Sequence, residues 1–329
     1  MFANPVLVEV LRGDRVESLH RGAVAVAAAD GRLVIGRGDF AQPIFPRSAV
    51  KPLQALPLIE TGAADRFGLD ARHIALACAS HSGTSEHTGR VAEWLERLGL
   101  GPDALECGAH VPIDAAAARA LIRAREGPSA LHNNCSGKHT GFLSAARHLG
   151  EATAGYIRRD HPAQRRVAAA LAEMTGAADA PWAIDGCGIP TFALPLSAIA
   201  AGMARLADPA ALAPARRGAV LRIRDAMSRH PVLVAGPGRF DTEVMTAAPQ
   251  VLVKGGAEGV HAAILPARGL GVAVKIDDGA GRAAEVAMLA VLHRMGAFTP
   301  EQWAALEHRA RPVIRNVAGL PVGCARPAP

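Results

Sequence analysis

Hydrophobic and polar residues follow different periods in different parts of the chain, and this predicts the order of its elements. Residues 5–38 are rich in apolar residues, which predicts strands there. They contain Asp30-Gly31, a dipeptide typical of hairpin turns. In the middle of the chain, apolar residues recur at helical spacing. The predicted helices cover residues 49–60, 85–98, 115–124, 140–148, 162–174 and 196–229, and we expect breaks at Pro57 and near Pro209 and Pro214.

The last third of the chain returns to strands and closes with a helix. The pattern predicts strands over residues 250–253, 260–265 and 271–276, and a helix over 282–295. Residues 73–79 predict one more buried strand, and residues 185–190 a tight turn. The chain after Arg311 is rich in proline and glycine, so we expect a tail there.

Strands at both ends and helices between them indicate an α+β protein rather than a series of βαβ units. The simplest assembly places the N- and C-terminal strands in one antiparallel sheet flanked by helices. We therefore expect one catalytic unit, residues 1–329, made of two lobes. The sheet lobe would contain about residues 1–45 and 230–329, and residues 46–229 would form a mostly helical lobe.

Composition narrows the function classes. The chain has 329 residues, of which 50% are hydrophobic and 20% charged, which is typical of a globular protein. Its net charge of +6 is spread along the chain and aromatics make up only 4%, so we expect no nucleic-acid partner. Its five cysteines are widely spaced and predict no disulfide framework. Neither a signal peptide nor a membrane span is recognisable, so we expect a cytoplasmic protein with no membrane partner.

Lysine is rare in this chain, since only four of its 36 basic residues are lysines. A buried lysine can lose its proton and act as a base or a metal ligand, which arginine cannot do. Lys51, Lys138 and Lys254 lie among small residues, serines or cysteines, whereas Lys275 lies in an alternating strand and is expected to face water. Chance retention of a few lysines is the alternative explanation.

Serine and lysine occur in an order that suits nucleophilic catalysis. Ser48 and Lys51 are three residues apart and share one face of a helix, where a neutral amine can accept the hydroxyl proton. Lys254 ends an apolar strand and precedes two glycines that permit close backbone approach. Penicillin-recognising serine enzymes have this order, although their middle motif is Ser-Asp-Asn and here it reads Ser80-His81-Ser82. Chance occurrence of Ser-x-x-Lys, and a solvated lysine at a strand end, are the alternatives.

A second group of residues suits a metal. Cys135 and Cys187 can supply thiolates, Lys138 an amine and Asp185 a carboxylate, a set that favours a thiophilic divalent ion such as zinc. The spacing is not Cys-x-x-Cys, so two semi-buried thiols beside tight turns are the alternative.

Four segments together resemble the Rhizobium-type L-asparaginases, which form class 3, the thermolabile asparaginase II family. They are residues 47–54 (RSAVKPLQ), 78–83 (CASHSG), 132–141 (HNNCSGKHTG) and 185–190 (DGCGIP). The likeness extends in the same order over about residues 5–315. It implies a fold like that of serine β-lactamases and glutaminases, and a homodimer. It also implies hydrolysis of L-asparagine to L-aspartate and ammonia, with L-glutamine disfavoured as a substrate.

The resemblance also assigns roles to residues. It implies two Ser–Lys pairs, Ser48–Lys51 and Ser80–Lys254, and a zinc site of Cys135, Lys138 and Cys187. We expect Ser48 to be the nucleophile and Ser80 with Lys254 to relay protons, while zinc serves structure or substrate alignment. The candidates for holding the substrate are Arg47, His139, Asp185, Gly186 and Gly188.

Three other functions remain open at this stage. They are a β-lactamase- or esterase-like serine acyl hydrolase, a glutaminase, and a non-catalytic module that binds zinc or nucleic acid.

Overall fold

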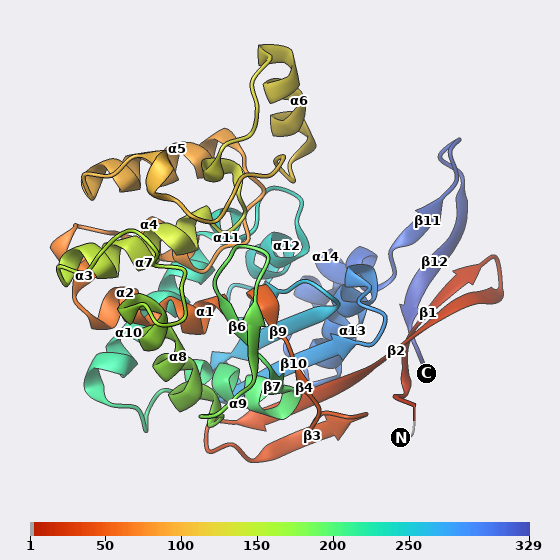
Figure 1. Ribbon diagram of the computed structural model, residues 1–329. Coiled ribbons are helices and arrows are strands. Elements are labelled where there is room, and N and C mark those ends of the chain that lie inside the picture. Colours follow the sequence, from red (N-terminus) through yellow and green to blue (C-terminus); the bar gives the residue numbers. More distant parts are fainter. Residues whose placement is uncertain (1–2) are drawn as a thin grey trace. The chain divides into compact units, whose positions relative to one another are not determined.

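The computed structural model describes residues 3–329, which form two compact units (Figure 1). The sheet unit comprises Met1–Ala49, Leu194–Asp208 and Glu243–Pro329. The helical unit comprises Val50–Ala193 and Pro209–Thr242. The boundaries differ from the expected lobes at Leu194–Asp208, which lie mid-chain but belong to the sheet unit because the helix they form packs on its strands. They differ again at residues 230–242, which were expected in the sheet lobe but belong to the helical unit.

An eight-stranded antiparallel sheet forms the centre of the sheet unit. Its strands follow the order β11-β12-β1-β2-β10-β9-β8, and β3 pairs with β2. The strands are β1 (Val6–Arg12), β2 (Arg15–Ala28), β3 (Leu33–Arg37), β8 (Leu252–Gly255), β9 (Val260–Leu265), β10 (Leu270–Ile276), β11 (Val313–Arg315) and β12 (Pro321–Pro327). The N- and C-terminal strands therefore pair in one sheet, which confirms the expected α+β class. A separate ribbon joins β4 (Pro43–Ile44) to β7 (Leu194–Pro195).

Helices α9 (Leu196–Ala207) and α13 (Gly281–Arg294) pack on this sheet. At Gly271 in β10, a Cβ atom would lie 2.1 Å from the carbonyl oxygen of Ala200, so only glycine lets α9 approach so closely. Helix α14 (Pro300–Ala310) packs on α13, and the short helix η4 (Pro266–Arg268) joins β9 to β10. Along the sequence, one boundary between the units falls within helix α12 (Phe240–Ala247) and another within the 3-10 turn η1 (Arg47–Val50).

The prediction of a C-terminal tail is wrong, because β11 and β12 complete the sheet beside β1. The prolines that suggested a tail stand at the first and last residues of β12, Pro321 and Pro327. Proline is tolerated at strand ends, where a missing N–H interrupts little of the ladder. Helix α14 was also missed, although Thr299 and Gln302 cap its first turn reciprocally.

Helices dominate the other unit. They are α1 (Lys51–Gln54), α2 (Leu56–Glu60), α3 (Ala63–Arg66), α4 (Ala71–Ala77), α5 (Ser85–Arg97), η2 (Pro102–Ala104), α6 (Ala115–Ala124), η3 (Ala130–His132), α7 (Ser136–His148), α8 (Pro162–Thr175), α10 (Pro214–Arg229) and α11 (Pro231–Val234), with the hairpin β5 (Trp182–Ile184) and β6 (Pro190–Phe192). The break expected at Pro57 occurs two residues earlier, at Ala55, because Pro57 stands in the first turn of α2. The break expected near Pro209 and Pro214 separates α9 from α10.

The strand predicted over residues 73–79 is in fact helix α4. The carboxylate of Asp70 accepts hydrogen bonds from the backbone N–H groups of Arg72 and His73 and so caps the first turn. A short apolar run that is buried on all sides has no helical or strand period to distinguish it, which explains the error.

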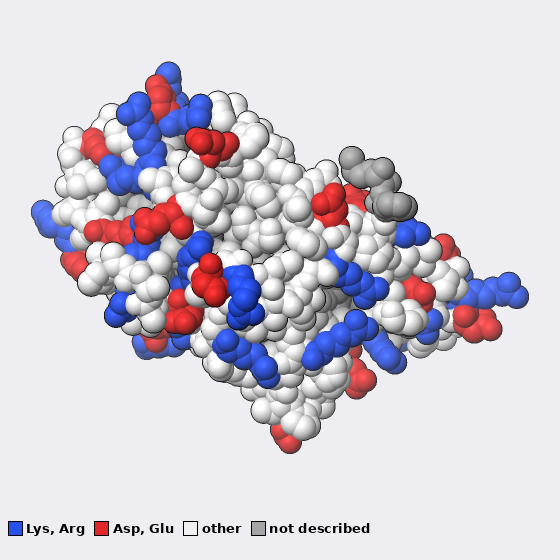
Figure 2. All heavy atoms as spheres, turned by 90° about the horizontal axis from the view of Figure 1, so that it is seen from below, with Lys and Arg blue, Asp and Glu red and all other residues white. Residues whose placement is uncertain are grey.

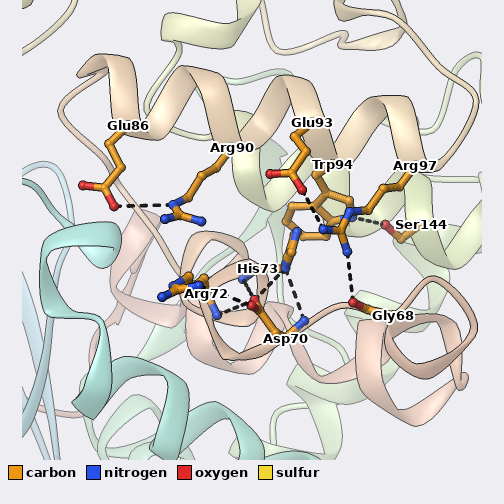
Figure 3. A network of polar contacts seen from close by, with 10 residues as sticks. All are labelled: Gly68, Asp70, Arg72, His73, Glu86, Arg90, Glu93, Trp94, Arg97 and Ser144. Atoms are coloured by element: carbon orange, nitrogen blue, oxygen red, sulfur yellow. Dashed lines mark hydrogen bonds and ion pairs between the residues drawn. The ribbon is translucent and has the colours of Figure 1, made fainter.

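A polar network ties α4, α5 and α7 together (Figure 3). Trp94 of α5 donates from Nε1 to the hydroxyl of Ser144 in α7 at 3.0 Å, and its ring meets that of His73 in α4 edge-on. Arg97 of α5 donates to the carbonyl oxygen of Gly68 before α4. Helix α7, which carries Lys138 and His139, is thereby fastened to α4 and α5.

On the face drawn in Figure 2, basic and acidic side chains are interspersed. Within residues 3–329, no helix is both long and apolar enough to span a membrane.

Candidate active site

The segment that contains Ser80 follows α4 directly and is held by backbone hydrogen bonds within the helical unit. The N–H of Ser80 donates to the carbonyl of Val234 at 2.9 Å, and the N–H of His81 donates to the carbonyl of Asn134 at 3.1 Å. The hydroxyl of Ser82 donates to the carbonyl of Ala235 at 2.8 Å. This extended segment is thus fixed on both sides, which gives the buried Ser80 hydroxyl a defined position.

Lys51 is completely buried at the first residue of α1. Its Nζ donates to the Oγ of Ser80 at 3.0 Å and to the carbonyl oxygen of Ala79. Burial lowers the pKa of Lys51 because it disfavours the ammonium form, and the nearby ammonium of Lys138 lowers it further, against the influence of Cys135. A lysine with a lowered pKa beside a serine hydroxyl is equipped to exchange a proton with it.

Ser48 lies in the 3-10 turn η1, next to a strained residue. Arg47 has a φ of +51°, in the left-handed region that residues with a side chain rarely adopt. Such strain persists where the surrounding structure enforces it, and it clusters at active sites. Ser48 lies in η1, which ends at Val50, and Lys51 is the next residue, the first of α1.

Within the sheet unit, the end of β8 approaches the backbone around Ser48. A Cβ atom on Gly256 would lie 2.6 Å from the carbonyl oxygen of Pro46 and 3.1 Å from the backbone nitrogen of Ala49. The preceding Lys254 is buried, and its Nζ donates to the carbonyl of Gly255 at 2.7 Å. The backbone at Gly256 is therefore close to the segment that carries Ser48. An approach of these glycines to a ligand stays a prediction.

Substitution of Gly256 should displace that segment. We expect Gly256→Ala to lower kcat about 100-fold, because a shift near 1 Å in a reacting group has an effect of that size. Gly218→Ala is the matched control, since a Cβ there meets no atom within 4 Å. Steady-state ammonia release measures both variants, and wild-type kcat in Gly256→Ala would contradict the positioning role.

Two cysteines and a lysine converge in the helical unit. Cys135 precedes α7, Lys138 lies in its first turn, and Cys187 lies in the turn before β6. The Nζ of Lys138 donates to the Sγ of Cys187 at 3.2 Å, and the two cysteine side chains are hydrogen-bonded to each other. All three side chains are buried.

The charges in this cluster support one another. The hydrogen bond from Cys187 and the nearby ammonium groups hold the pKa of Cys135 well below that of an ordinary thiol. The pKa of Cys187 is raised in turn, by the same hydrogen bond and by burial. Burial alone would lower the pKa of Lys138, but the two cysteines and Asp185 outweigh it and raise that pKa. The cluster is therefore best described as a Cys135 thiolate with a Lys138 counter-ion.

The predicted tight turn is present around Asp185. The N–H of Gly188 donates to the carbonyl of Asp185 at 2.9 Å, and Gly188 has a φ of +88° that favours glycine. The carboxylate of Asp185 accepts a hydrogen bond from the N–H of Gly186 at 2.8 Å, and its second oxygen lies 3.9 Å from the Sγ of Cys187. The turn thus places a carboxylate beside the thiols.

His139 has a defined tautomer, fixed by the chain's single tyrosine. The hydroxyl oxygen of Tyr156 accepts from the N–H of Glu106 at 2.9 Å, so its proton is directed to the Nδ1 of His139 at 2.7 Å. Burial and the charges of Lys138 and Lys51 hold the pKa of His139 well below its usual value. The neutral ring therefore carries its proton on Nε2, which has no hydrogen-bond partner among residues 3–329. The sequence signalled Tyr156 only by its being the single tyrosine.

His81 and Ser136 form a second buried pair that the sequence patterns did not single out as a site. The Nδ1 of His81 accepts from the N–H of Gly83 at 3.1 Å, so its Nε2 donates to the hydroxyl of Ser136 at 2.8 Å. That hydroxyl donates to the carbonyl of Leu131 at 3.0 Å. The pair fastens the Ser80 segment to the start of α7.

Among the described residues 3–329, no group of three or more His, Cys, Asp or Glu side chains is arranged to hold a metal ion. A metal at the thiol cluster would thus need Lys138 as its third ligand. Two sulfurs and one amine already converge in a buried position, and they suit zinc once Lys138 gives up its proton, because only a neutral amine can bind a metal.

The family model of L-asparaginase II matches residues 8–327. The chain belongs to this family, which confirms the resemblance, and it is an L-asparaginase, a hydrolase that acts on a linear amide.

Comparison with curated proteins finds no significant match. The chain is similar to the solved structure of a β-lactamase from Mycobacterium bovis, with a TM-score of 0.44 and 15% identity over 83% of this chain and 94% of that one. It is also similar to a mutant of simvastatin synthase from Aspergillus terreus, with a TM-score of 0.33 and 12% identity over 83% of this chain and 91% of that one.

The structure thus brings Lys51 together with Ser80, and Lys138 together with Cys135 and Cys187. The pairs Ser48–Lys51 and Ser80–Lys254 stay predictions. So do the substrate contacts of Arg47, His139, Asp185, Gly186 and Gly188.

Proposed function

We propose that the chain hydrolyses the side-chain amide of L-asparagine to L-aspartate and ammonia by serine chemistry in which Lys51 is the base. The observation that carries the proposal is the buried amine of Lys51, 3.0 Å from the hydroxyl of Ser80 and with a lowered pKa. Membership of the L-asparaginase II family supports asparagine as the substrate.

In the first half-reaction, the Oγ of Ser48 bonds to the amide carbon while its proton passes to the neutral amine of Lys51. The spacing of three residues between Ser48 and Lys51 supports this assignment. The resulting ammonium of Lys51 donates to Ser80, whose own proton passes to the nitrogen of the leaving group. The carbon–nitrogen bond then breaks, ammonia leaves, and an aspartyl ester of Ser48 remains.

In the second half-reaction, a water molecule attacks the ester carbon and gives its proton to Lys51, which is neutral again after the first. The carbon–oxygen bond to Ser48 breaks, and Ser48 recovers its proton as L-aspartate is released. Lys254, which the family resemblance pairs with Ser80, completes the proposed machinery by taking part in the proton relay. Each half-reaction leaves the proton count of the protein unchanged.

Substrate recognition follows from charge. The half-buried carboxylate of Asp185 suits the α-ammonium group of asparagine, and Arg47 suits its α-carboxylate. The Nε2 of His139, which has no partner among the described residues, is a candidate for holding the amide oxygen as it becomes negative. The N–H groups of Gly186 and Gly188 already donate to Asp185, so the turn would hold that oxygen only by giving up those bonds.

We also propose that Cys135, Lys138 and Cys187 hold a zinc ion. Bound there, zinc would supply a Lewis-acidic centre that aligns substrate. The expected content is about one zinc per chain when the protein is purified without chelator. Cys135→Ser and Cys187→Ser should each lower it more than tenfold, whereas Cys324→Ser, at a half-buried cysteine elsewhere, should not. Elemental analysis by mass spectrometry decides, and full zinc in both thiol variants would contradict the assignment.

Ammonia release from L-asparagine, with L-glutamine assayed alongside, tests the proposed activity. We expect release from asparagine to exceed release from glutamine, and Ser48→Ala and Ser80→Ala each to lower kcat at least about 10³-fold. If Ser80→Ala is inactive while Ser48→Ala is not, Ser80 is the nucleophile instead. Release from neither amide, with or without added zinc, would refute the proposal and direct attention to lactams and esters.

The family resemblance further supports a homodimer in the cytoplasm. Sedimentation velocity tests the first of these expectations, and a monomer at micromolar concentration would contradict it.

A further inference from the structure

An apolar cavity of about 130 Å³ lies within the sheet unit, and none of its lining residues belongs to the proposed catalytic machinery. Strands β1, β2 and β3 contribute Leu7, Val24 and Ile35, α13 contributes Val291, and Met295 directly after α13 also lines the cavity. Its wall also contains two arginines, Arg37 of β3 and Arg294 in the last turn of α13. The cavity is therefore apolar inside with positive charge on its wall.

The register of the sheet explains how the cavity forms. In the β2–β3 ladder, Val24 is paired with Arg37 and Val26 with Ile35, so Arg37 and Ile35 lie on the same face as Val24. Successive turns of α13 present Ala287, Val291 and Arg294 along one side of the helix to this face. Strand β3 pairs only with β2, so the hollow between it and α13 is left unfilled.

Neither guanidinium group has a partner in the described part of the chain. Among residues 3–329, neither Arg37 nor Arg294 makes a side-chain hydrogen bond, an ion pair or a cation–π contact. Other arginines of this unit are paired, such as Arg326 with Glu9 and Arg309 with Glu243. No acidic residue lines the cavity. Two unneutralised cations beside an apolar hollow are complementary to an anion with an apolar body.

The volume limits the size of that body. An apolar protein cavity of roughly 150 Å³ stays dry and binds benzene, so a cavity of about 130 Å³ has room for one phenyl ring or a short branched chain. We propose that this cavity is a binding site for a small apolar monocarboxylate, with the apolar body between α13 and the sheet and the carboxylate at Arg37 and Arg294. The site is separate from the proposed asparaginase chemistry and does not depend on it.

Calorimetric titration with phenylacetate tests this site, with L-aspartate present in excess so that carboxylate sites used by the product are occupied. We expect one phenylacetate per chain. Charge-assisted hydrogen bonds are worth enough that Arg37→Gln and Arg294→Gln should each weaken binding at least about tenfold. Arg123→Gln, on the exposed face of α6, is the matched control and should bind as the wild type does.

Two further comparisons separate the apolar and ionic parts of the proposal. Ala290→Phe should abolish binding by filling the cavity, since Ala290 also lines it. Benzylamine and 2-phenylethanol have the same ring but no carboxylate, so we expect them to bind at least about tenfold more weakly. Asparaginase activity of every variant reports that it has folded.

Several results would overturn the proposal. One is the absence of any heat of binding with phenylacetate, and another is an affinity for 2-phenylethanol equal to that for phenylacetate. A third is wild-type affinity for phenylacetate in the double variant Arg37→Gln/Arg294→Gln. The fourth is loss of the phenylacetate signal when L-aspartate is added. The last result would assign the binding to the asparaginase site instead.

Discussion

Lys51→Met is expected to lower kcat for asparagine by about 10⁴-fold or more, the largest effect on activity of any single substitution outside the serines. Methionine fills a similar volume but cannot accept a proton, so Ser48 loses its base and the leaving nitrogen loses its proton source. Lys51 is fully buried, and the hydrogen bond from its amine to Ser80 would disappear. Single-turnover release of ammonia measures the chemical step directly.

The pH profile distinguishes a base from a merely structural lysine. Because burial lowers the pKa of Lys51, the wild-type rate should rise with pH as the amine loses its proton, with a midpoint below that of an ordinary lysine. Lys51→Arg keeps the positive charge but stays protonated, so it should be inactive at every pH. A variant at Lys51 that retains more than a tenth of the wild-type rate would refute the assignment.

Lys275→Met is the matched control for Lys51. Lys275 was expected to face water, but it is half-buried and its Nζ donates to the carbonyl oxygens of Glu258 and Ile276 at 2.6 Å. Its pKa is also lowered by burial. Since Lys275 has no serine partner in the described residues, its loss should leave kcat within about threefold of the wild type.

The elements of this fold could be predicted from sequence where local patterns are unambiguous. Helix α6 begins and ends as predicted, because Asp114 caps its first turn and apolar periodicity ends with it. Helix α4 and strand β12 could not be predicted, because in neither segment do the hydrophobic positions recur with a helical or a strand period. Helix α4 is buried on nearly all sides, and β12 is a strand because β1 lies beside it. Both depend on tertiary contacts.

The site shows the same division. Ser48, Lys51, Ser80 and Lys254 could be selected as candidate catalytic residues from their motifs and from the rarity of lysine. The hydrogen bond from Lys51 to Ser80 could not, because it joins residues 29 apart in the chain, one at the start of α1 and one in the segment after α4. Tyr156 escaped notice for a related reason, since its role appears only once Glu106 and His139 fix the direction of its hydroxyl proton.

Lys138→Met should produce the largest loss of stability. It would leave the Cys135 thiolate buried without its counter-ion, and removing one partner of a buried ion pair costs about 3–5 kcal/mol in the free energy of unfolding. Lys138 would also be lost as a zinc ligand, so the loss should appear both with and without chelator. Urea unfolding at neutral pH measures it.

The double variant Lys138→Met/Cys135→Ala separates the charge effect from lost packing. With the thiolate removed as well, no uncompensated charge remains, so we expect the double variant to be more stable than Lys138→Met alone, by roughly 1–3 kcal/mol. A purely additive pair, in which the second substitution only destabilises further, would show that the ammonium of Lys138 does not balance the charge of Cys135. In that case Lys138 would stabilise the unit through its buried methylene chain rather than through its charge.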